Sequence, residues 1–120
     1  MPQGAILVKW GEPIRGREAD IVQHADEAAT LGDDLIAEGR IRAVRVFMNA
    51  TGNTQEWAGT LIMEGDLEDL RELQHSERFA EMLERAHEVA QNVSVVLAIG
   101  GAPKDVVPAL RKYAERLPLL

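Results

Sequence analysis

The chain has 120 residues and a formal net charge of −7, with 20 acidic side chains against 13 Lys and Arg, and it contains no cysteine. The acidic excess argues against nucleic-acid binding, whose affinity comes mostly from cations that neutralise phosphates, and against binding to an acidic membrane surface. The lack of cysteine excludes disulfides, thiolate nucleophiles and the usual structural zinc sites. The length predicts one domain, residues 1–120, and without a signal peptide or an apolar run of membrane-spanning length we expect it in the cytoplasm.

The first half of the chain predicts a strand, a helix and a second strand. The apolar run Ala5–Trp10 is typical of a buried strand. Apolar residues then recur at helical spacing over Glu18–Gly39, and Gly39 is well placed to end that helix. Gly32 inside it costs about 1 kcal/mol relative to alanine, so we expect close packing on the sheet at this point. The two-residue alternation over Ile41–Met48 predicts the second strand.

The middle of the chain is organised around a strand that leads directly into a long amphipathic helix. Trp57–Met63 is an apolar strand, and the turn chemistry of Gly52–Asn53 predicts that it pairs antiparallel with the strand before it. The helix is expected to begin at Asp66, whose carboxylate would accept a hydrogen bond from the first helical turn. A break at His75 and Ser76 leaves open whether this helix is one helix or two.

The end of the chain adds a fourth strand, Val93–Ile99, and a helix that begins near Pro103 or Pro108 and stops before Pro118. One face of that helix is apolar and comprises Val106, Leu110, Tyr113 and Leu117. This order of elements is the α+β ferredoxin-like plan with an added helix, in which four antiparallel strands stand in the order 4-1-3-2. Both main helices cover one face of such a sheet. Because the other face also carries apolar residues, we expect a second copy of the chain to cover it.

Several stretches are similar to the dimeric α/β-barrel superfamily, and in particular to a group of uncharacterised bacterial proteins within it. Gly65–Leu70 followed by His75–Phe79 resembles the superfamily's strand-to-helix passage, and Val8–Pro13 with Gly16–Ala19 resembles the bacterial group. The resemblance covers most of the chain and implies two subunits whose sheets pack face to face and enclose a barrel. The superfamily includes haem-degrading monooxygenases, lactone isomerases, polyketide cyclases and effector-binding domains, so the fold does not select a function.

Haem-degrading chemistry is disfavoured by the same resemblance. When the superfamily's Ser-x-x-Phe pattern is placed on Ser76 and Phe79, Leu73 and Leu83 stand where the haem-degrading enzymes have a tryptophan and a histidine. The chain therefore lacks the side chains that the resemblance assigns to haem.

Two charged side chains within strands are candidates for a ligand site. Lys9 and Arg45 are expected to point together into the lumen between the two sheets. A buried charge without a partner is very costly, so either an ion-pair network with Glu56 or Glu64 or an anionic ligand must satisfy them. A carboxylate or phenolate would suit a position near Arg45.

Aromatic residues and histidines supply the remaining candidates. Trp10 and Trp57 either line a pocket for a planar ligand or pack at the dimer interface. His75 falls at the helix break, which would border the mouth of the barrel. With His24 and His87 it is too widely spaced to form a local ligand pair, so we expect no metal site.

Three functional hypotheses follow. The leading one is a homodimer that binds a small organic molecule, aromatic or anionic, in the barrel, with no built-in cofactor. The second is a cofactor-free monooxygenase or isomerase, and the third is a structural or regulatory protein that presents its acidic helices to a partner. The predicted ligand-binding residues are Lys9, Trp10, Arg45, Trp57 and His75.

Overall fold

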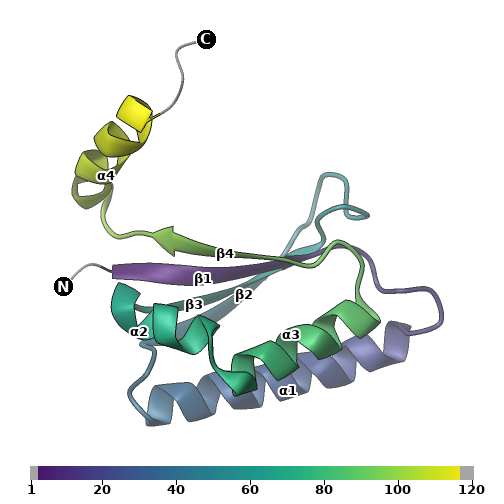
Figure 1. Ribbon diagram of the computed structural model, residues 1–120. Coiled ribbons are helices and arrows are strands. Elements are labelled where there is room, and N and C mark those ends of the chain that lie inside the picture. The colour runs from purple at the N-terminus through teal and green to yellow at the C-terminus, as the bar shows by residue number, and fades with distance from the viewer. Residues whose placement is uncertain (1–2, 117–120) are drawn as a thin grey trace.

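A computed structural model describes residues 3–116, which form one antiparallel sheet with α1, α2 and α3 on one face (Figure 1). The elements in chain order are β1 (Gln3–Trp10), α1 (Glu18–Ala37), β2 (Ala43–Met48), β3 (Gly59–Asp66), α2 (Leu67–Gln74), α3 (Glu77–Val89), β4 (Ser94–Ile99) and α4 (Pro103–Arg116). The four strands stand in the order β2-β3-β1-β4, which confirms the ferredoxin-like arrangement expected from the sequence. No helix within residues 3–116 is long and apolar enough to cross a membrane.

The strand register assigns each side chain to one face of the sheet. Residues directly opposite each other on paired strands share a face, and successive residues alternate between faces. Ile6 lies opposite Met63 and Leu97, and all three face the helices. Leu7 lies opposite Ile62 and Val96 on the other face, which α1, α2 and α3 leave uncovered. We call this second face the open face.

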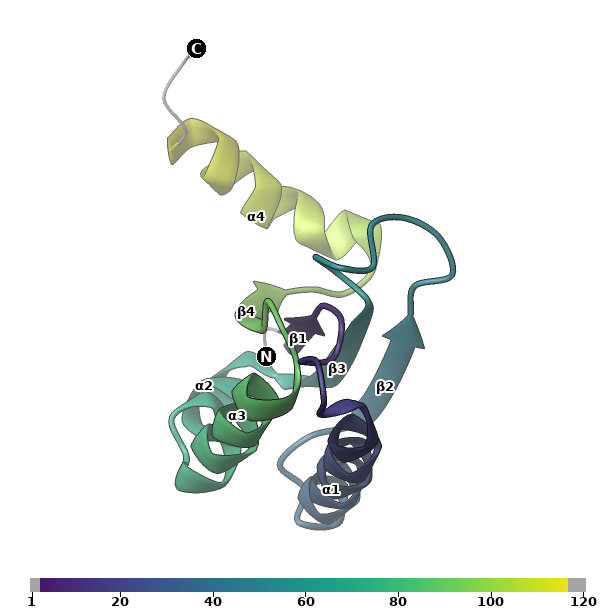
Figure 2. The same cartoon turned by 90° about the vertical axis from the view of Figure 1, so that its right-hand side faces the viewer.

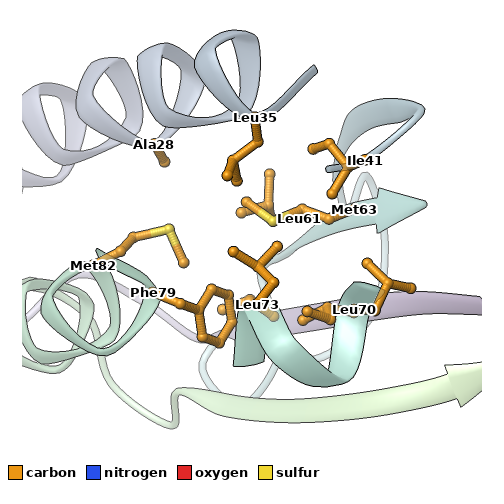
Figure 3. Packing of buried hydrophobic residues seen from close by; sticks show 11 residues of the cluster. Ala28, Leu35, Ile41, Leu61, Met63, Leu70, Leu73, Phe79 and Met82 are labelled. Carbon is orange, nitrogen blue, oxygen red and sulfur yellow. The ribbon is translucent and has the colours of Figure 1, made fainter. Parts of the chain in front are cut away.

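The hydrophobic core lies between the sheet and the three covering helices. Ile6, Met63, Leu35, Leu70 and Phe79 are fully buried, each with a relative exposure of 0%. They come from β1, β3, α1, α2 and α3 in turn, and Figure 3 shows how the side chains from the helices meet those from β3. Burial of one such side chain stabilises the fold by roughly 1.5–3 kcal/mol. The core therefore holds all three helices to one face of the sheet.

Two glycines shape α1 as the sequence predicts. Gly39 follows the helix with φ of +74°, and the amides of Gly39 and Arg40 donate to the carbonyls of Ile36 and Leu35, which is the usual glycine-terminated helix end. Gly32 is buried against β2, where an added Cβ would lie 2.8 Å from Cγ2 of Val44. Close packing on the sheet thus accounts for the glycine inside the helix.

The long helix expected after β3 is two helices, and Ser76 forms the break between them. Its hydroxyl donates to the Leu73 carbonyl at 2.7 Å and accepts from the Phe79 amide at 3.3 Å, so it ends α2 and caps α3. Asp66 is the N-cap residue of α2, as expected, but the predicted hydrogen bond is wrong, because its side chain accepts none from the first helical turn. Asp66 instead accepts a hydrogen bond from the Gln3 side chain, its cross-strand neighbour on β1.

β2 and β3 pair antiparallel, as the turn chemistry of Gly52–Asn53 predicts, and a long loop connects them. Residues 49–58 form a loop, and β3 begins at Gly59, so the prediction that Trp57 lies on a strand is wrong. The loop is closed by the Asn49 amide, which donates to the Ala58 carbonyl at 2.7 Å. Within the loop, Trp57 is free of the sheet register and turns its ring over the open face, where its Nε1 donates to Thr60 Oγ1 at 2.8 Å.

The last helix, α4, stands apart from the sheet, on the side away from α1, α2 and α3 (Figures 1 and 2). It begins at Pro103 and contains Pro108, and none of its residues is buried. Leu110 and Tyr113 of its predicted apolar face are 57% and 62% exposed. Leu117, which was expected on the same face, lies outside the described residues.

Candidate functional site

Three of the predicted ligand-binding residues lie on the open face, and two of them, Lys9 and Trp57, are in contact. Lys9 is opposite Thr60 on β3, and Arg45 is opposite Ile62 on the same strand. Thr60 and Ile62 are two residues apart, so the two cations share a face of the sheet. Trp57 joins them from the loop after β2. The pattern of alternation therefore placed Lys9 and Arg45 correctly relative to the sheet.

Each of the two cations already has a partner within its own chain. The Lys9 ammonium lies 4.1 Å from the centroid of the Trp57 ring, a distance at which a cation is attracted to the face of an aromatic ring. Arg45 Nε lies 3.1 Å from Glu64 Oε2. Of the two carboxylates considered from the sequence, Glu64 is thus the one that pairs with Arg45. The charges of Lys9 and Arg45 thus have partners within the chain and do not require an anionic ligand.

The other two predicted residues lie elsewhere. Trp10 is on β1 next to Lys9, but its side chain points to the helix-covered face, where its ring packs over Gly59 beside Met48. His75 is exposed at the junction of α2 and α3, and its amide donates to the Glu72 carbonyl. The structure does not bring Trp10 or His75 together with Lys9, Arg45 and Trp57, because the sheet lies between the two groups.

A pocket of about 520 Å³ lies on the helix-covered face, and we call it the helix-side pocket. Its volume is within the usual range for small-molecule sites, roughly 300–1,000 Å³. The pocket opens to solvent between α1 and β2. The exposed large hydrophobic residues of its lining lie there: Val22, Val46 and Met48, at 65%, 57% and 64%. The walls include Val8, Trp10, Val44 and Leu61 of the sheet, Ile21, Ala25, Ala28 and Ala29 of α1, and Met82, Ala86 and Val89 of α3.

Small side chains on the two helices account for the space. Ala25, Ala28 and Ala29 line the pocket from α1, and Ala86 lines it from α3. An alanine leaves empty the volume that a leucine would fill, so the helix is held over the sheet without closing on it. The pocket was not predicted, because alanines at helical spacing are also typical of an ordinary packed core. The cluster of alanines at helical spacing was the available signal.

His24 is one of the few polar residues in the pocket wall, with Asp33. Burial lowers the pKa of the His24 imidazole below 6.5, partly opposed by the carboxylate of Glu27, while Arg85 lowers it further. Arg85 and Glu27 pair at 2.8 Å between α3 and α1. Nδ1 of His24 is buried and has no hydrogen-bond partner among the described residues. The wall thus contains a neutral imidazole within an apolar lining.

Residues 3–116 contain no group of three or more His, Asp or Glu side chains placed to hold a metal ion. The acidic residues are instead spread along the exposed sides of α1, α2 and α3 or paired with arginines, as in the 2.9 Å contact between Glu38 and Arg78. Hydrogen bonding to Arg78 holds the pKa of Glu38 below its usual value. These carboxylates stabilise contacts between helices.

Comparison with known proteins identifies the fold but not a sequence family. No family model matches the chain, and no curated protein matches it. Among solved structures, it is similar to a dimeric protein of unknown function with a ferredoxin-like fold from Bacteroides fragilis, with 16% identity and a TM-score of 0.56 over 82% of this chain and 96% of that one. It is also similar to the hydroxynitrile lyase from Passiflora edulis, with 8% identity and a TM-score of 0.67 over 84% of this chain and 95% of the lyase.

A third similar structure is a conserved protein of unknown function from Bacteroides thetaiotaomicron, described as a possible oxidoreductase. It has 16% identity and a TM-score of 0.54 over 82% of this chain and 95% of that chain. At these identities the likeness concerns the fold alone. The chain thus has the α+β ferredoxin-like fold, and the resemblance to dimeric ferredoxin-like proteins drawn from its sequence is found again in its structure.

Proposed function

We propose that the protein is a cytoplasmic homodimer in which each subunit binds one small, largely apolar organic molecule in the helix-side pocket. The observation that carries the proposal is the pocket itself, about 520 Å³ with a mainly aliphatic lining, one tryptophan and two polar side chains, His24 and Asp33. Small-molecule sites typically combine apolar walls with a few polar groups that orient the ligand. Trp10 supplies a flat surface for an aromatic ring, and the described part of the pocket wall contains no Lys or Arg side chain to pair with an anionic ligand.

The binding test uses N-phenyl-1-naphthylamine, an uncharged aromatic probe whose fluorescence rises in apolar surroundings. We expect saturable binding to the wild-type protein. Val46→Asp places a carboxylate at the pocket mouth, and because an unpaired charge in an apolar site is costly, the Kd should rise about tenfold or more. Val46 is 57% exposed, so its replacement should leave the fold intact.

Val96→Asp is the matched control for this test. Val96 is 48% exposed and lies, like Val46, on a strand at one edge of the sheet, but its side chain is on the open face. All walls of the pocket come from one chain. Val96→Asp should therefore bind the probe with the same Kd as the wild type, whether the variant is a monomer or a dimer. Absence of probe binding to the wild type, or equal binding to Val46→Asp, would contradict the proposal.

The homodimeric part of the proposal is supported by the open face. Phe47 and Val96 on that face are 55% and 48% exposed, and Leu7 and Ile62 lie between them on the central strands. Exposed apolar surface of this extent is typical of an interface. The similar protein from Bacteroides fragilis is described as dimeric. In such a dimer Lys9, Arg45 and Trp57 would face the partner, and their part in ligand binding stays a prediction.

A second candidate is a cofactor-free enzyme, an isomerase or a monooxygenase, and His24 favours it. A neutral imidazole in an apolar pocket can accept a proton from a bound molecule and return it at another position. Nearby Glu27 would stabilise the imidazolium that forms. Mass spectrometry of a small-molecule extract incubated with the protein separates the two functions. An enzyme converts a component, and His24→Gln stops the conversion while leaving probe binding intact, whereas a binding protein converts nothing.

A further inference from the structure

We propose that α4 is an arm that packs its apolar stripe on a second copy of this chain, beside the open face. The stripe consists of Val106, Val107, Leu110 and Tyr113, the last three 40%, 57% and 62% exposed. This inference rests on the proposed homodimer and adds to it the element that completes the interface.

The position of α4 supports this role. Figures 1 and 2 both show α4 on the side of the sheet opposite α1, α2 and α3, which is the side of the open face. Gly101 has φ of +149°, a conformation that side chains rarely adopt, and it directs the helix away from its own sheet. An amphipathic helix without a buried residue has gained little from packing on its own chain. Its apolar stripe thus lies where a facing subunit would be.

The size of the open face indicates that the sheet alone makes a small interface. With the four strands spaced about 4.8 Å apart and a rise of about 3.3 Å per residue over roughly six residues, the face measures about 400 Å² in outline. A stable interface takes about 800 Å² from each partner. The 14 residues of α4 form a helix about 21 Å long, which adds on the order of 200 Å². The arm would therefore enlarge the contact by about half.

Charge also favours a second copy as the occupant. α4 carries four cationic side chains and two acidic ones, a net charge of +2, whereas the whole chain carries −7. Two acidic subunits repel each other, and a basic arm from each placed on the other offsets part of that repulsion. The cationic residues are Lys104, Arg111, Lys112 and Arg116.

The test is the dimer dissociation constant of the full chain carrying Leu110→Ser and Tyr113→Ser, measured by sedimentation equilibrium. Truncating two apolar anchors of an interface should raise the Kd about 10- to 100-fold. Glu115→Ser, on the opposite side of the same helix, should leave the Kd unchanged. In a Val96→Asp background, which we expect to be monomeric, the double change should not alter the unfolding midpoint, because Leu110 and Tyr113 are exposed and only Val106 and Ala109 of α4 are half-buried in their own chain.

The possible failures are distinguishable. A wild-type protein that stays monomeric overturns both the homodimer and the arm. A wild-type dimer whose Kd is unaffected by the double change overturns the arm and leaves the homodimer standing. A lowered unfolding midpoint in the monomeric background would mean that α4 packs on its own chain, which also overturns the arm. If the wild type co-sediments with phosphatidylserine vesicles, and the double variant does not while its dimer Kd is unchanged, the helix binds membranes instead.

Discussion

Gly32 is a residue at which tertiary packing overrides helix propensity. It lies inside α1, where alanine would be preferred by about 1 kcal/mol, but an added Cβ would meet the stiff, branched side chain of Val44 at 2.8 Å. Overpacking of this kind costs about 1–3 kcal/mol. After the gain in helix propensity is subtracted, we expect Gly32→Ala to lower the free energy of unfolding in urea by up to about 2 kcal/mol.

A double-variant cycle checks the physical reason for that loss. In a Val44→Ala background the added methyl has room, so Gly32→Ala should become neutral or stabilising. Gly100→Ala is the matched control, because an added Cβ at Gly100 meets nothing within 4 Å. An equal loss in both backgrounds would show that the contact with Val44 is not the cause.

His24 should make the stability of the protein depend on pH. Burial lowers the pKa of its imidazole in the folded state, so the unfolded chain binds more protons as the pH falls through the unfolded value of about 6.5. Acidification from about pH 7.5 to about pH 5 should therefore lower the free energy of unfolding of the wild type more than that of His24→Gln. Urea unfolding at both pH values measures the difference. A difference between the two proteins that does not change with pH would refute this account.

At the scale of elements, Ser76 determines where α2 ends and α3 begins. Its hydroxyl serves both helices, as donor to the Leu73 carbonyl and acceptor from the Phe79 amide. Loss of an N-cap side chain typically costs about 1 kcal/mol, so Ser76→Ala should lower the free energy of unfolding by about that amount. Ser76→Thr keeps the hydroxyl and should retain most of the stability. Equal losses for both variants, measured in urea, would show that the hydroxyl is not responsible.

The elements show which parts of the fold the sequence can predict. The strands follow from local patterns, such as the alternation over Ile41–Met48, which assigns Val44 and Val46 to the helix-covered face. The capping hydrogen bond of Asp66, though not its position at the helix start, was mispredicted because a residue 63 positions away, Gln3, donates to its carboxylate. The start of β3 was mispredicted at Trp57 because the Trp57 ring contacts Lys9 and Thr60, and the local sequence pattern does not contain those contacts.

The candidate site was only partly predictable for a related reason. Alternation assigned Lys9 and Arg45 to one face, since a strand's period of two is a local property. The helix-side pocket depends on how closely α1 approaches the sheet, which Gly32 and the alanines of α1 and α3 decide together. Such a distance between elements is not encoded in any one segment. His24 becomes a candidate site residue only because that distance leaves a pocket beside it.

At the scale of the whole molecule, the proposed dimer has a direct test. Val96→Asp introduces a carboxylate into the open face opposite Leu7, where a facing subunit would bury it without a partner. We expect the wild type to sediment as a dimer at micromolar concentration and Val96→Asp as a monomer. Val46→Asp carries the same charge on the helix-covered face and should stay dimeric. A dimer that survives Val96→Asp would move the interface elsewhere.

The two tryptophans lie on opposite faces of the same sheet, Trp10 in the helix-side pocket and Trp57 over the open face. Each therefore serves as an intrinsic optical reporter for one event. In Trp57→Phe the emission of Trp10 should respond to pocket filling and ignore dilution. In Trp10→Phe the emission of Trp57 should respond to dilution, and it should ignore pocket filling by a ligand that does not absorb light where tryptophan emits. Ligand occupancy and subunit exchange can thus be followed separately in the same protein, without an attached dye.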